Sequence, residues 1–577
     1  MMNFKNLPEN WKAVRLGRVA DIHQGKTPRR SDYLDFGRFK ILKVRDITEN
    51  RTIDWGIEEK GFISEGLANS YKHYTVKEND ILFTASAHSP EHIGKKLVIV
   101  EKIPNQFDDV FHVAELIRIR AFSKQLNSHF LYYLLSSEEG YKMIQDQVQG
   151  VHVYPKDLAN LFIPLAPLPE QKRIVEILSL AEDLIKKQKE AIALIDKILM
   201  AKFLEMFGDP ATNPKGWEVR RLSEMAIRQK GAIKMGPFGS QIKKSEFVPT
   251  GIKVYGQENV IKNDFSIGNR FITLQKFKKL KSCEIHPGDI LLTMMGTIGH
   301  IAIFPENAQK GIMDSHLIRI KLNKELVNPV YLRLLFKTSY LRHQLETFGH
   351  GVVMKGLNAT LVKNLKIPLP PIELQKQFAQ IVEEFEKKRK EMQNTLEILE
   401  SLFKVLQKKA FTGELTAEWR EKQKIDWELP KITERQAILL ALLYYSHVVL
   451  KKPAMLTFAM KETFLLQREA GLNLGYMFIP YKYGPFSKEV YKDLEELEKN
   501  LLVEKVKPNK DIEKTEVTIS EDFKDWVEKL IDNLPESHKT LIQSYVQKYG
   551  TLSYNELIDY VYSHYPEFST KSKRKKK

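Results

Sequence analysis

The chain has 577 residues, and its 90 Lys and Arg against 73 Asp and Glu give a formal net charge of +17. This length exceeds what one hydrophobic core supports and predicts three or four domains. The positive charge indicates a polyanionic partner, nucleic acid first and an anionic membrane surface second. The single cysteine, Cys283, excludes an intramolecular disulfide framework and a cysteine-rich zinc site.

No secretory signal is recognisable in the first residues, and the longest apolar run, 437–450, is shorter than a membrane span. That run is therefore expected to form a buried helix. We expect a soluble, cytoplasmic protein.

The chain repeats itself at an interval of about 200 residues. Four groups of residues recur in the same order: Pro8, Trp11, Arg15, Leu16 and Ala20 at Pro214, Trp217, Arg221, Leu222 and Ala226; 79–84 at 288–293; 116–119 at 317–320; and 163–172 at 367–376. Between these anchors the copies differ widely, as in 24–30 against 235–241. A shared frame with divergent loops is expected of two modules that recognise different ligands, although decay of an old duplication would look similar.

Each repeat begins with short β-rich runs separated by Gly, Asn and Asp turns, which predicts a small α/β globule, and ends in one long helix. We call the two globules the first head and the second head. The expected parts, in chain order, are the first head 1–166, a helix 167–207, the second head 208–370, a helix 371–415, a charged linker 416–432, a C-terminal domain 433–565 and a disordered basic tail 566–577.

Both predicted long helices carry an apolar seam with alternating steps of four and three, which is typical of a coiled coil. The seam residues are Ile174, Leu178, Ile185, Ile192, Ile195 and Leu199 in the first helix, and Phe378, Val382, Phe385, Met392, Leu396, Leu399 and Phe403 in the second. We expect the two helices to pack antiparallel, with Gln188 opposite Arg389 and the heads at opposite ends. The alternative is that each helix packs only on its own head.

These repeated features, with Pro167–Lys172 and the Trp-x-x-x-Arg-Leu start of each head, resemble the specificity subunit of type I restriction-modification enzymes over roughly residues 7–415. The resemblance implies an α/β tandem repeat of two target recognition domains that each read half of a split site on double-stranded DNA. It also implies that the helices space the halves and dock two methylation subunits, which restriction (motor-nuclease) subunits join. S-adenosylmethionine, ATP and Mg are then expected on those partner subunits and no cofactor on this chain.

Candidate DNA-contacting residues lie in Gly-rich or polar loops near predicted strands. Gln can read adenine, Arg can read guanine and Lys can hold phosphate. The candidates are Gln24, Lys26, Thr27, Arg29, Arg30, Ser86, His88, Gln149, His152 and Tyr154 in the first head, and Lys234, Ser240, Gln241, Gln257, Glu258, Asn259, Thr297 and His350 in the second. For each of them a structural role remains an alternative. His88 and His92 are joined by no further ligand cluster, so no metal site is expected.

No catalytic motif stands out. The only Pro-Pro pair, Pro370-Pro371, lacks the flanking residues of an amino-methyltransferase motif, and neither a Gly-x-Gly-x-x-Gly loop nor a Walker lysine loop is present. We expect a non-catalytic specificity subunit. The alternative is a stand-alone DNA-binding regulator or an antitoxin-like interaction protein that acts through its C-terminal domain.

The C-terminal domain is predicted to be mainly helical, with 501–505 and 516–519 pairing as a β-wing. Helices are expected at 433–450, 457–470, 487–499, 521–532, 536–548 and 553–563. The run 478–487, with Tyr483-Gly-Pro-Phe-Ser487 at its end, resembles small winged-helix domains of the antitoxin-like Panacea type. That resemblance implies a module that contacts protein or DNA, while the motif itself could simply be a helix entry.

Overall fold

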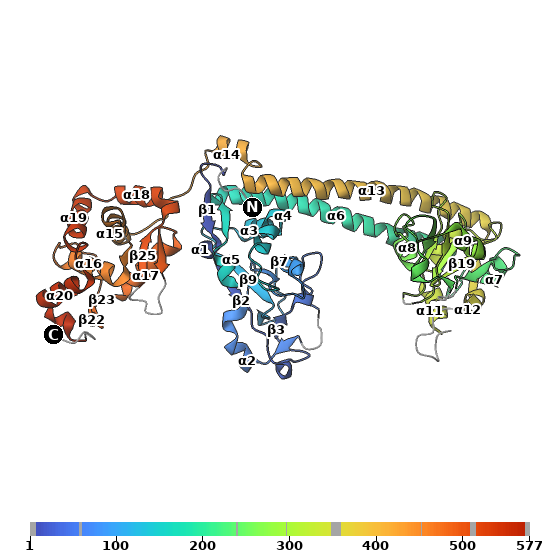
Figure 1. The fold of residues 1–577 in the computed structure, drawn as a ribbon, viewed down its shortest axis with the longest axis horizontal. Helices are drawn as coiled ribbons and strands as arrows, with labels where there is room; N and C mark the ends of the chain where they lie inside the picture. The colour runs from blue at the N-terminus through green and yellow to red at the C-terminus, as the bar shows by residue number, and fades with distance from the viewer. Residues whose placement is uncertain are drawn as a thin grey trace. The chain divides into compact units, whose positions relative to one another are not determined.

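The computed structural model describes residues 7–571 apart from 57–60, 238–240, 296, 348–358, 452 and 508–514 (Figure 1). By its internal contacts the chain divides into two compact units, Met1–Glu182 with Ser401–Lys577, and Asp183–Glu400. The first unit holds the first head and the C-terminal domain, and the second unit holds the second head. Each long helix contributes one part to each unit.

The first head contains two four-stranded sheets and a separate strand pair. Its sheets have the orders β2-β9-β6-β7 and β4-β3-β8-β5, and β1 pairs with β10. Its elements are β1 (Lys12–Arg15), α1 (Leu16–Val19), β2 (Ala20–Gln24), β3 (Phe39–Leu42), β4 (Phe62–Ile63), α2 (Glu65–Ser70), β5 (Thr75–Val76), β6 (Ile81–Thr84), β7 (Leu97–Ile99), β8 (Asp109–His112), β9 (Leu116–Ala121), α3 (Ser128–Ser136), α4 (Glu138–Gln145), α5 (Pro155–Ala159) and β10 (Phe162–Leu165).

The second head repeats this topology strand for strand. Its orders are β12-β19-β16-β17 and β14-β13-β18-β15, with β11 paired to β20, and β13–β18 is parallel as β3–β8 is. Its elements are β11 (Glu218–Arg221), α7 (Leu222–Met225), β12 (Ile233–Met235), β13 (Ile252–Tyr255), α8 (Gln257–Lys262), β14 (Phe271–Ile272), α9 (Leu274–Lys279), β15 (Glu284–Ile285), β16 (Ile290–Thr293), β17 (Ile301–Ile303), β18 (Gly311–Met313), β19 (Leu317–Ile320), α10 (Pro329–Leu335), α11 (Ser339–Thr347), α12 (Ala359–Lys363) and β20 (Lys366–Leu369). The predicted α/β tandem repeat is confirmed.

The repeated Gln of the Pro-rich motif locks each long helix onto its head. Gln171 is fully buried; it accepts the Asn127 backbone N–H (2.8 Å) and donates to the carbonyls of Gln125 (2.8 Å) and Ala166 (2.7 Å). Gln375 makes the equivalent bonds to Asn328, Leu326 and Pro370 in the second head. One side chain thus satisfies three backbone groups from two segments, which explains why this residue recurs.

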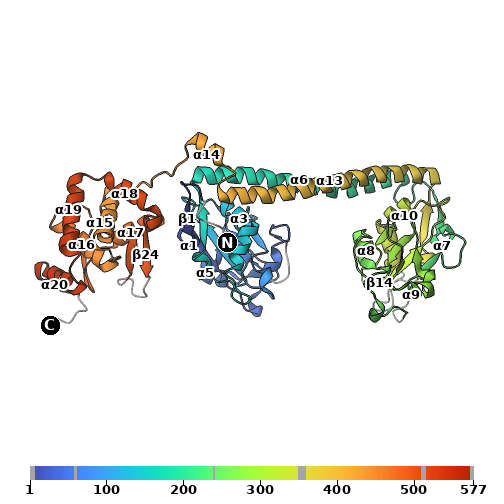
Figure 2. The same ribbon diagram turned by 45° about the horizontal axis from the view of Figure 1, so that its top comes forward.

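The two long helices, α6 (Leu168–Phe207) and α13 (Ile372–Thr412), lie beside each other in Figures 1 and 2. Within the second unit, Arg389 bonds Asp196 (2.9 Å), Lys189 pairs with Glu400 (2.7 Å), and Gln188 donates to the Met392 carbonyl (2.8 Å). From Asp196–Arg389 to Lys189–Glu400, the residue number falls along α6 as it rises along α13, which confirms that the helices pack antiparallel. The expected pairing of Gln188 with Arg389 is wrong, because in this register Arg389 meets the carboxylate of Asp196.

The helices also pack on the heads, so both packing modes weighed from the sequence occur. In the first unit, Ile174 and Leu178 share a core with Trp11, and the Phe411 ring lies 5.4 Å from that of Phe130. In the second unit, Leu199 and Phe203 of α6 and Phe378 and Val382 of α13 enter the head core. Of the predicted seam residues, Ile174, Leu178, Ile195, Leu199, Phe378, Val382 and Leu396 are buried, and Ile185, Ile192, Phe385, Met392, Leu399 and Phe403 are half-buried.

The segment after α13 folds back on the first head instead of leaving it as a free linker. The buried carboxylate of Glu170 accepts bonds from Trp11 Nε1 (3.0 Å), Thr416 Oγ1 (2.6 Å) and Arg420 (2.6 Å). Thr416 directly precedes the short helix α14 (Ala417–Gln423), and Arg420 lies within it. The ordered α14 therefore replaces part of the charged linker predicted over 416–432.

The C-terminal domain has six helices among the described residues, as predicted, and a three-stranded sheet β21-β25-β24. Its elements are α15 (Glu434–Leu450), β21 (Ala454–Met455), α16 (Leu456–Arg468), β22 (Ile479–Tyr481), β23 (Gly484–Phe486), α17 (Lys488–Lys499), β24 (Val503–Lys507), β25 (Glu516–Ile519), α18 (Lys524–Asp532), α19 (Glu536–Tyr549) and α20 (Tyr554–His564). The predicted wing is the antiparallel pair β24–β25. The domain extends past the predicted boundary at 565, since Phe568 is buried against Phe464.

Candidate nucleic-acid interface

A glycine at the same structural position starts the first variable loop of each head. Gly25 follows β2 and donates to the Leu116 carbonyl (3.1 Å), while Gly236 follows β12 and donates to the Leu317 carbonyl (2.9 Å). A Cβ at Gly25 would overlap the backbone carbonyl oxygen of Val113, and a Cβ at Gly236 would overlap that of Asp314. Only glycine fits there, so the divergent loops 24–30 and 235–241 leave their sheets at equivalent points.

Four segments of the first head come together beside this glycine. Ala85 donates to the Glu115 carbonyl (2.8 Å), and Val153 donates to the Ala85 carbonyl (3.0 Å). Ser86 Oγ lies 2.8 Å from His152 Nδ1. We call the segments 24–30, 85–88, 113–116 and 149–154 the first loop cluster, which contains every candidate that the sequence suggested for the first head.

Within the first loop cluster, some candidate side chains hold the loops and others are exposed. Gln24 donates to the Ala114 carbonyl (2.8 Å), and Thr27 donates to Glu115 (3.0 Å). Lys26 lies 5.0 Å from the Tyr71 ring centre. The exposed candidates are Lys26, Thr27, Arg29, Arg30, His88, Gln149, His152 and Tyr154.

The second head has a matching cluster after β12 and β16. Met294 donates to the His316 carbonyl (3.0 Å), as Ala85 does to that of Glu115. Thr293 donates to the Thr297 carbonyl (2.5 Å), and Lys234 donates to Ser282 (2.5 Å). Gln241 and Thr297 are exposed. The candidates Ser240 and His350 lie outside the described residues.

The three polar candidates at the start of α8 have different roles. Asn259 is 1% exposed; it accepts the Gly256 N–H (2.9 Å) and donates to the carbonyls of Asp264 and Ile267 (both 3.0 Å). Its amide therefore stabilises the loop. Glu258 is exposed and pairs with Arg270 (2.7 Å), and Gln257 is half-buried.

Two equivalent residues of these clusters, Glu115 and His316, were not among the residues predicted from the sequence. Each directly precedes the repeated Leu-Ile-Arg-Ile strand, and Glu115 is exposed while the His316 side chain is 44% exposed. The repeat itself was the available signal, because a residue that differs between the copies directly before the repeated Leu-Ile-Arg-Ile strand lies in a loop that the shared frame holds. His316 also accompanies Asp314, which bonds Arg270 (3.1 Å).

The equivalent arginines Arg118 and Arg319 are conserved between the repeats for structure, not for DNA contact. Both are nearly inaccessible, and burial lowers the pKa of each guanidinium from its ordinary value. Arg118 bonds Asp21 (2.5 Å), and Arg319 donates to the carbonyls of Gly231 (3.0 Å) and Glu284. Both guanidinium groups therefore stabilise contacts within their own heads.

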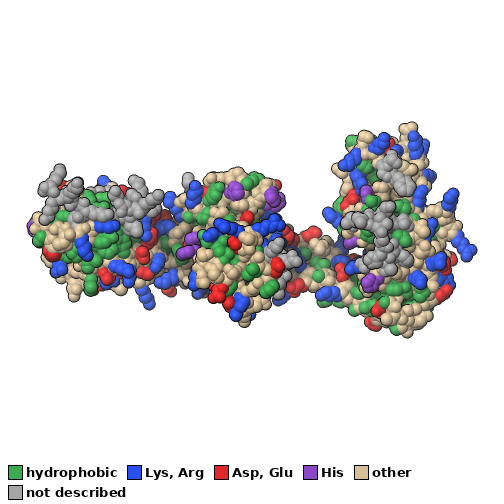
Figure 3. Space-filling model, turned by 90° about the horizontal axis from the view of Figure 1, so that it is seen from below, with side chains coloured by type: hydrophobic (Ala, Val, Ile, Leu, Met, Phe, Trp, Pro, Cys, Tyr) green, Lys and Arg blue, Asp and Glu red, His purple; other side chains and the backbone are tan. Residues whose placement is uncertain are grey.

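Most of the excess positive charge is carried by the repeated part of the chain. Residues 1–432 contain 67 Lys and Arg against 52 Asp and Glu, whereas the C-terminal domain, 433–565, contains 17 against 20. Lys and Arg side chains are spread over the face of both heads that Figure 3 shows. A polyanion is therefore attracted to the repeated part rather than to the C-terminal domain.

A second repeated feature is a set of exposed apolar residues at equivalent positions of the two long helices. Leu194 (50% exposed) and Ile198 (39%) of α6 have Ile398 (67%) and Leu402 (49%) of α13 as their equivalents, 204 positions later. We call these four residues the paired stripe. Residues four positions apart lie on one face of a helix, and a contiguous exposed apolar patch is typical of a protein-protein contact.

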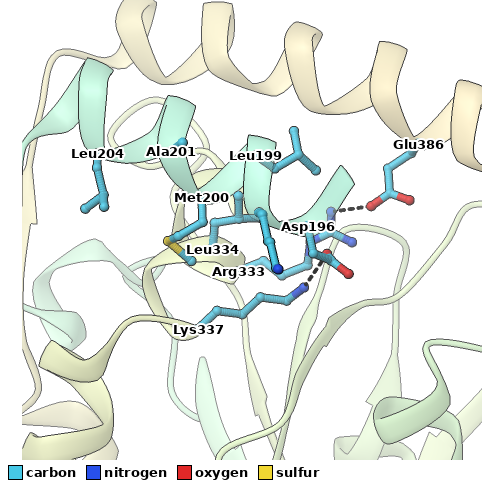
Figure 4. A pocket seen from close by; sticks show the side chains of 10 residues that line it. Asp196, Leu199, Met200, Ala201, Leu204, Arg333, Leu334, Lys337 and Glu386 are labelled. Carbon is cyan, nitrogen blue, oxygen red and sulfur yellow. Dashed lines mark hydrogen bonds and ion pairs between the residues drawn. The ribbon is translucent and has the colours of Figure 1, made fainter. Parts of the chain in front are cut away.

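A groove of about 490 Å³ lies next to Ile198 in the second unit, between α6, α10 and α13 (Figure 4). Leu199, Met200 and Leu204 give it an apolar side. The ion pairs Lys337–Asp196 (3.3 Å) and Arg333–Glu386 (3.4 Å) lie along its rim. This combination of an apolar floor with a charged rim suits a protein side chain better than a nucleotide.

Over the part of the chain that the structure describes, no cluster of three or more potential metal ligands occurs. In the same residues, no helix has the length and apolar character needed to cross a bilayer.

Comparison with known proteins identifies the class. Residues 8–194 and 214–401 each match the family model of the type I restriction modification DNA specificity domain, together well over half of the chain. The chain belongs to this family and is a non-catalytic specificity subunit. Residues 465–566 match the antitoxin SocA-like Panacea domain, so the resemblance of the C-terminal domain is confirmed.

Two curated relatives span the repeated part. The type I restriction enzyme MjaVIII specificity subunit of Methanocaldococcus jannaschii is 25% identical over 404 residues, covering 66% of this chain and 88% of the relative. The EcoBI specificity subunit of Escherichia coli is 23% identical over 454 residues, covering 72% and 88%. The crystal structure of the type I S subunit from M. genitalium aligns with a TM-score of 0.39 and 16% identity, over 71% of this chain and 98% of that one.

Proposed function

We propose that this specificity subunit recognises a bipartite DNA site, one half with each loop cluster. The observation that carries the proposal is that two heads of one topology present different residues from equivalent loops. A frame preserved for its fold and loops altered in composition are what two readers of different base sequences require.

In the first loop cluster, Arg29 and Arg30 are exposed and are suited to guanine edges or phosphates, with Lys26 beside them. In the second, Gln241, Glu258, Thr297 and Lys234 are the corresponding described candidates. Asn259 is left out of the proposed contacts because its amide is bonded within the head. The missed residues Glu115 and His316 are added to them.

The helices are proposed to hold the two half-sites at a fixed spacing and to carry the partner subunits. At 1.5 Å per residue, a helix of 40 residues is about 60 Å long, so it can set a distance of several base pairs or more. The paired stripe offers exposed apolar residues at equivalent positions of both helices, which fits two copies of a methylation subunit. Restriction subunits would join that core, and S-adenosylmethionine, ATP and Mg would be bound by the partners. The complex would act in the cytoplasm.

The Panacea match supports a second candidate function for the C-terminal domain, as an antitoxin-like interaction module. Its excess of acidic residues favours contact with protein over contact with DNA. This role adds to the specificity function and does not replace it, because the family match covers the repeated part of the chain.

Sequencing methylated adenines in genomic DNA with and without this gene tests the proposal. A split motif that disappears with the gene is expected. In a strain carrying Arg29→Ala with Arg30→Ala, methylation of that motif should fall on the order of tenfold or more, given about 1–3 kcal/mol for each base contact. Lys488→Ala, an exposed change in the C-terminal domain, serves as control. An unchanged set of methylated sites after loss of the gene would contradict the proposal.

A further inference from the structure

The first head carries a basic surface on β1 and α1 that the C-terminal domain covers. Arg18 of α1 donates to Ser520 Oγ (2.8 Å) and to the carbonyls of Leu501 (3.2 Å) and Val503 (3.4 Å). Its side chain is only 14% exposed and lies within 4 Å of Glu504 and Asp522. A guanidinium that is desolvated yet supplied with acceptors and two carboxylates holds two domains in one orientation.

Three further contacts surround this arginine. Lys12 of β1 pairs with Asp525 (3.3 Å), and Gln125 donates to the Lys499 carbonyl (2.7 Å). Trp427, in the connecting segment, donates to the Asn10 carbonyl (2.7 Å) and packs on Trp526 with ring centres 5.3 Å apart. The contact thus joins both sides through charge, backbone bonds and aromatic packing.

The second head has the opposite charges at the equivalent positions. β11 and α7 match β1 and α1, with Trp217 equivalent to Trp11, so Glu218 corresponds to Lys12 and Glu224 to Arg18. Glu218 pairs with Arg220 (2.8 Å) on its own strand, and Glu224 accepts the Arg221 backbone N–H (3.2 Å). An acidic edge made of Glu504, Asp522 and Asp525 would be repelled by two carboxylates at this position.

We propose that the C-terminal domain docks selectively on the first head, and that the charge reversal between Lys12/Arg18 and Glu218/Glu224 encodes this choice. Of the two copies of the duplicated framework, only the first head then carries the C-terminal domain. On the proposed function, any protein that the Panacea-like module binds is recruited beside the half-site that the first head reads. The selectivity resides in attraction at one head and like-charge repulsion at the other.

Hydrogen exchange of the full chain, followed by mass spectrometry, tests the docking without DNA. Lys12→Glu with Arg18→Glu gives the first head the residues of the second. We expect exchange in 499–504 and 518–526 to accelerate on the order of tenfold, because the docked surface opens. Arg15→Glu is the control: it reverses one positive charge at the exposed end of β1, where the side chain lies over Phe162 instead of the C-terminal domain.

Changes on the other side of the contact guard against misfolding of the head. Asp522→Lys with Asp525→Lys leaves the first head unaltered and should accelerate exchange in residues 10–20 similarly. Combining Arg18→Glu with Glu504→Arg and Asp522→Arg should restore protection. Equal exchange in the charge-reversed chains and the Arg15→Glu control would overturn the proposal. Since the readout needs no DNA, absence of DNA binding in the unaltered chain would contradict the proposed function and leave this result standing.

Discussion

Over the described residues, the two heads share the pairing of all their named strands but differ in what surrounds them. Trp11 donates its indole N–H to the buried Glu170, which also anchors Thr416 and Arg420, whereas Trp217 donates to the Phe207 carbonyl at the end of α6. Likewise the buried position occupied by His112 in the first head is Met313 in the second. The frame is thus preserved where backbone groups need partners, and it varies where one head has acquired a neighbour or a different loop.

The sharpest way to break the comparison is to replace one head. Exchanging residues 7–160 for the corresponding head of another family member should change one half of the methylated motif completely and leave the other half intact, because each loop cluster belongs to its own head. Methylated-base sequencing of a strain with the exchanged chain measures this. A change in both halves would show that the heads do not read independently.

Carboxylates placed at equivalent buried positions should destabilise each unit separately. Leu178 is fully buried in the first unit and Val382 is 2% exposed in the second. Leu178→Asp or Val382→Asp should each cost about 4 kcal/mol, since an unpaired charge enters a core. Calorimetric unfolding measures the loss. Leu180→Asp, at a 65% exposed neighbour, should cost little; equal costs at 178 and 180 would count against the packed helix pair.

Acid should destabilise the first head more than the second. Burial lowers the pKa of His112 from 6.5 to about 4, so the unfolded chain binds the proton first. The stability is complete above pH 6.5 and is lost as the pH falls toward 4, by about 3 kcal/mol. Denaturant unfolding of the first unit between pH 4 and 7 measures it. His112→Met, which copies the second head, should remove this dependence, and a slope that survives the substitution would refute the assignment.

Loss of the repeated buried glutamine should weaken both heads alike. Gln171→Leu or Gln375→Leu leaves three backbone groups without a partner and should cost about 2–3 kcal/mol in either unit. Gln188→Leu removes a single bond to the Met392 carbonyl and should cost about 1 kcal/mol. Thermal unfolding of the three variants gives the ranking, and a clear inequality between the first two would mean that the motif serves different purposes in the two heads.

The smallest effect on stability is expected at the paired stripe. Ile198→Asp and Leu402→Asp should each weaken the binding of one methylation subunit by on the order of tenfold. Neither should lower the unfolding temperature, because both side chains are exposed. The mass of the reconstituted complex measures the number of subunits bound. Asn394→Asp, exposed on α13, is the control. If both variants still bound two subunits at the original affinity, the stripe would not be the docking face.

Much of this organisation could be predicted from the sequence. The repeat located both heads, the seam located both long helices, and six helices and the wing of the C-terminal domain were placed within a few residues. The site was harder. Asn259 looked like a base reader but serves the fold, while Glu115 and His316 went unnoticed, because the direction of a loop side chain depends on backbone contacts from segments distant in sequence.

By itself, the sequence determined that the chain is a basic, duplicated α/β framework with two long amphipathic helices, since periodicity and repetition are local properties. Only the tertiary structure decided that Gly25 and Gly236 launch equivalent loops, that Glu170 gathers Trp11, Thr416 and Arg420, and that Arg18 receives the acidic edge of the C-terminal domain. These contacts join residues more than 75 positions apart, and the free energy of burying a polar group depends on partners that no local pattern reveals.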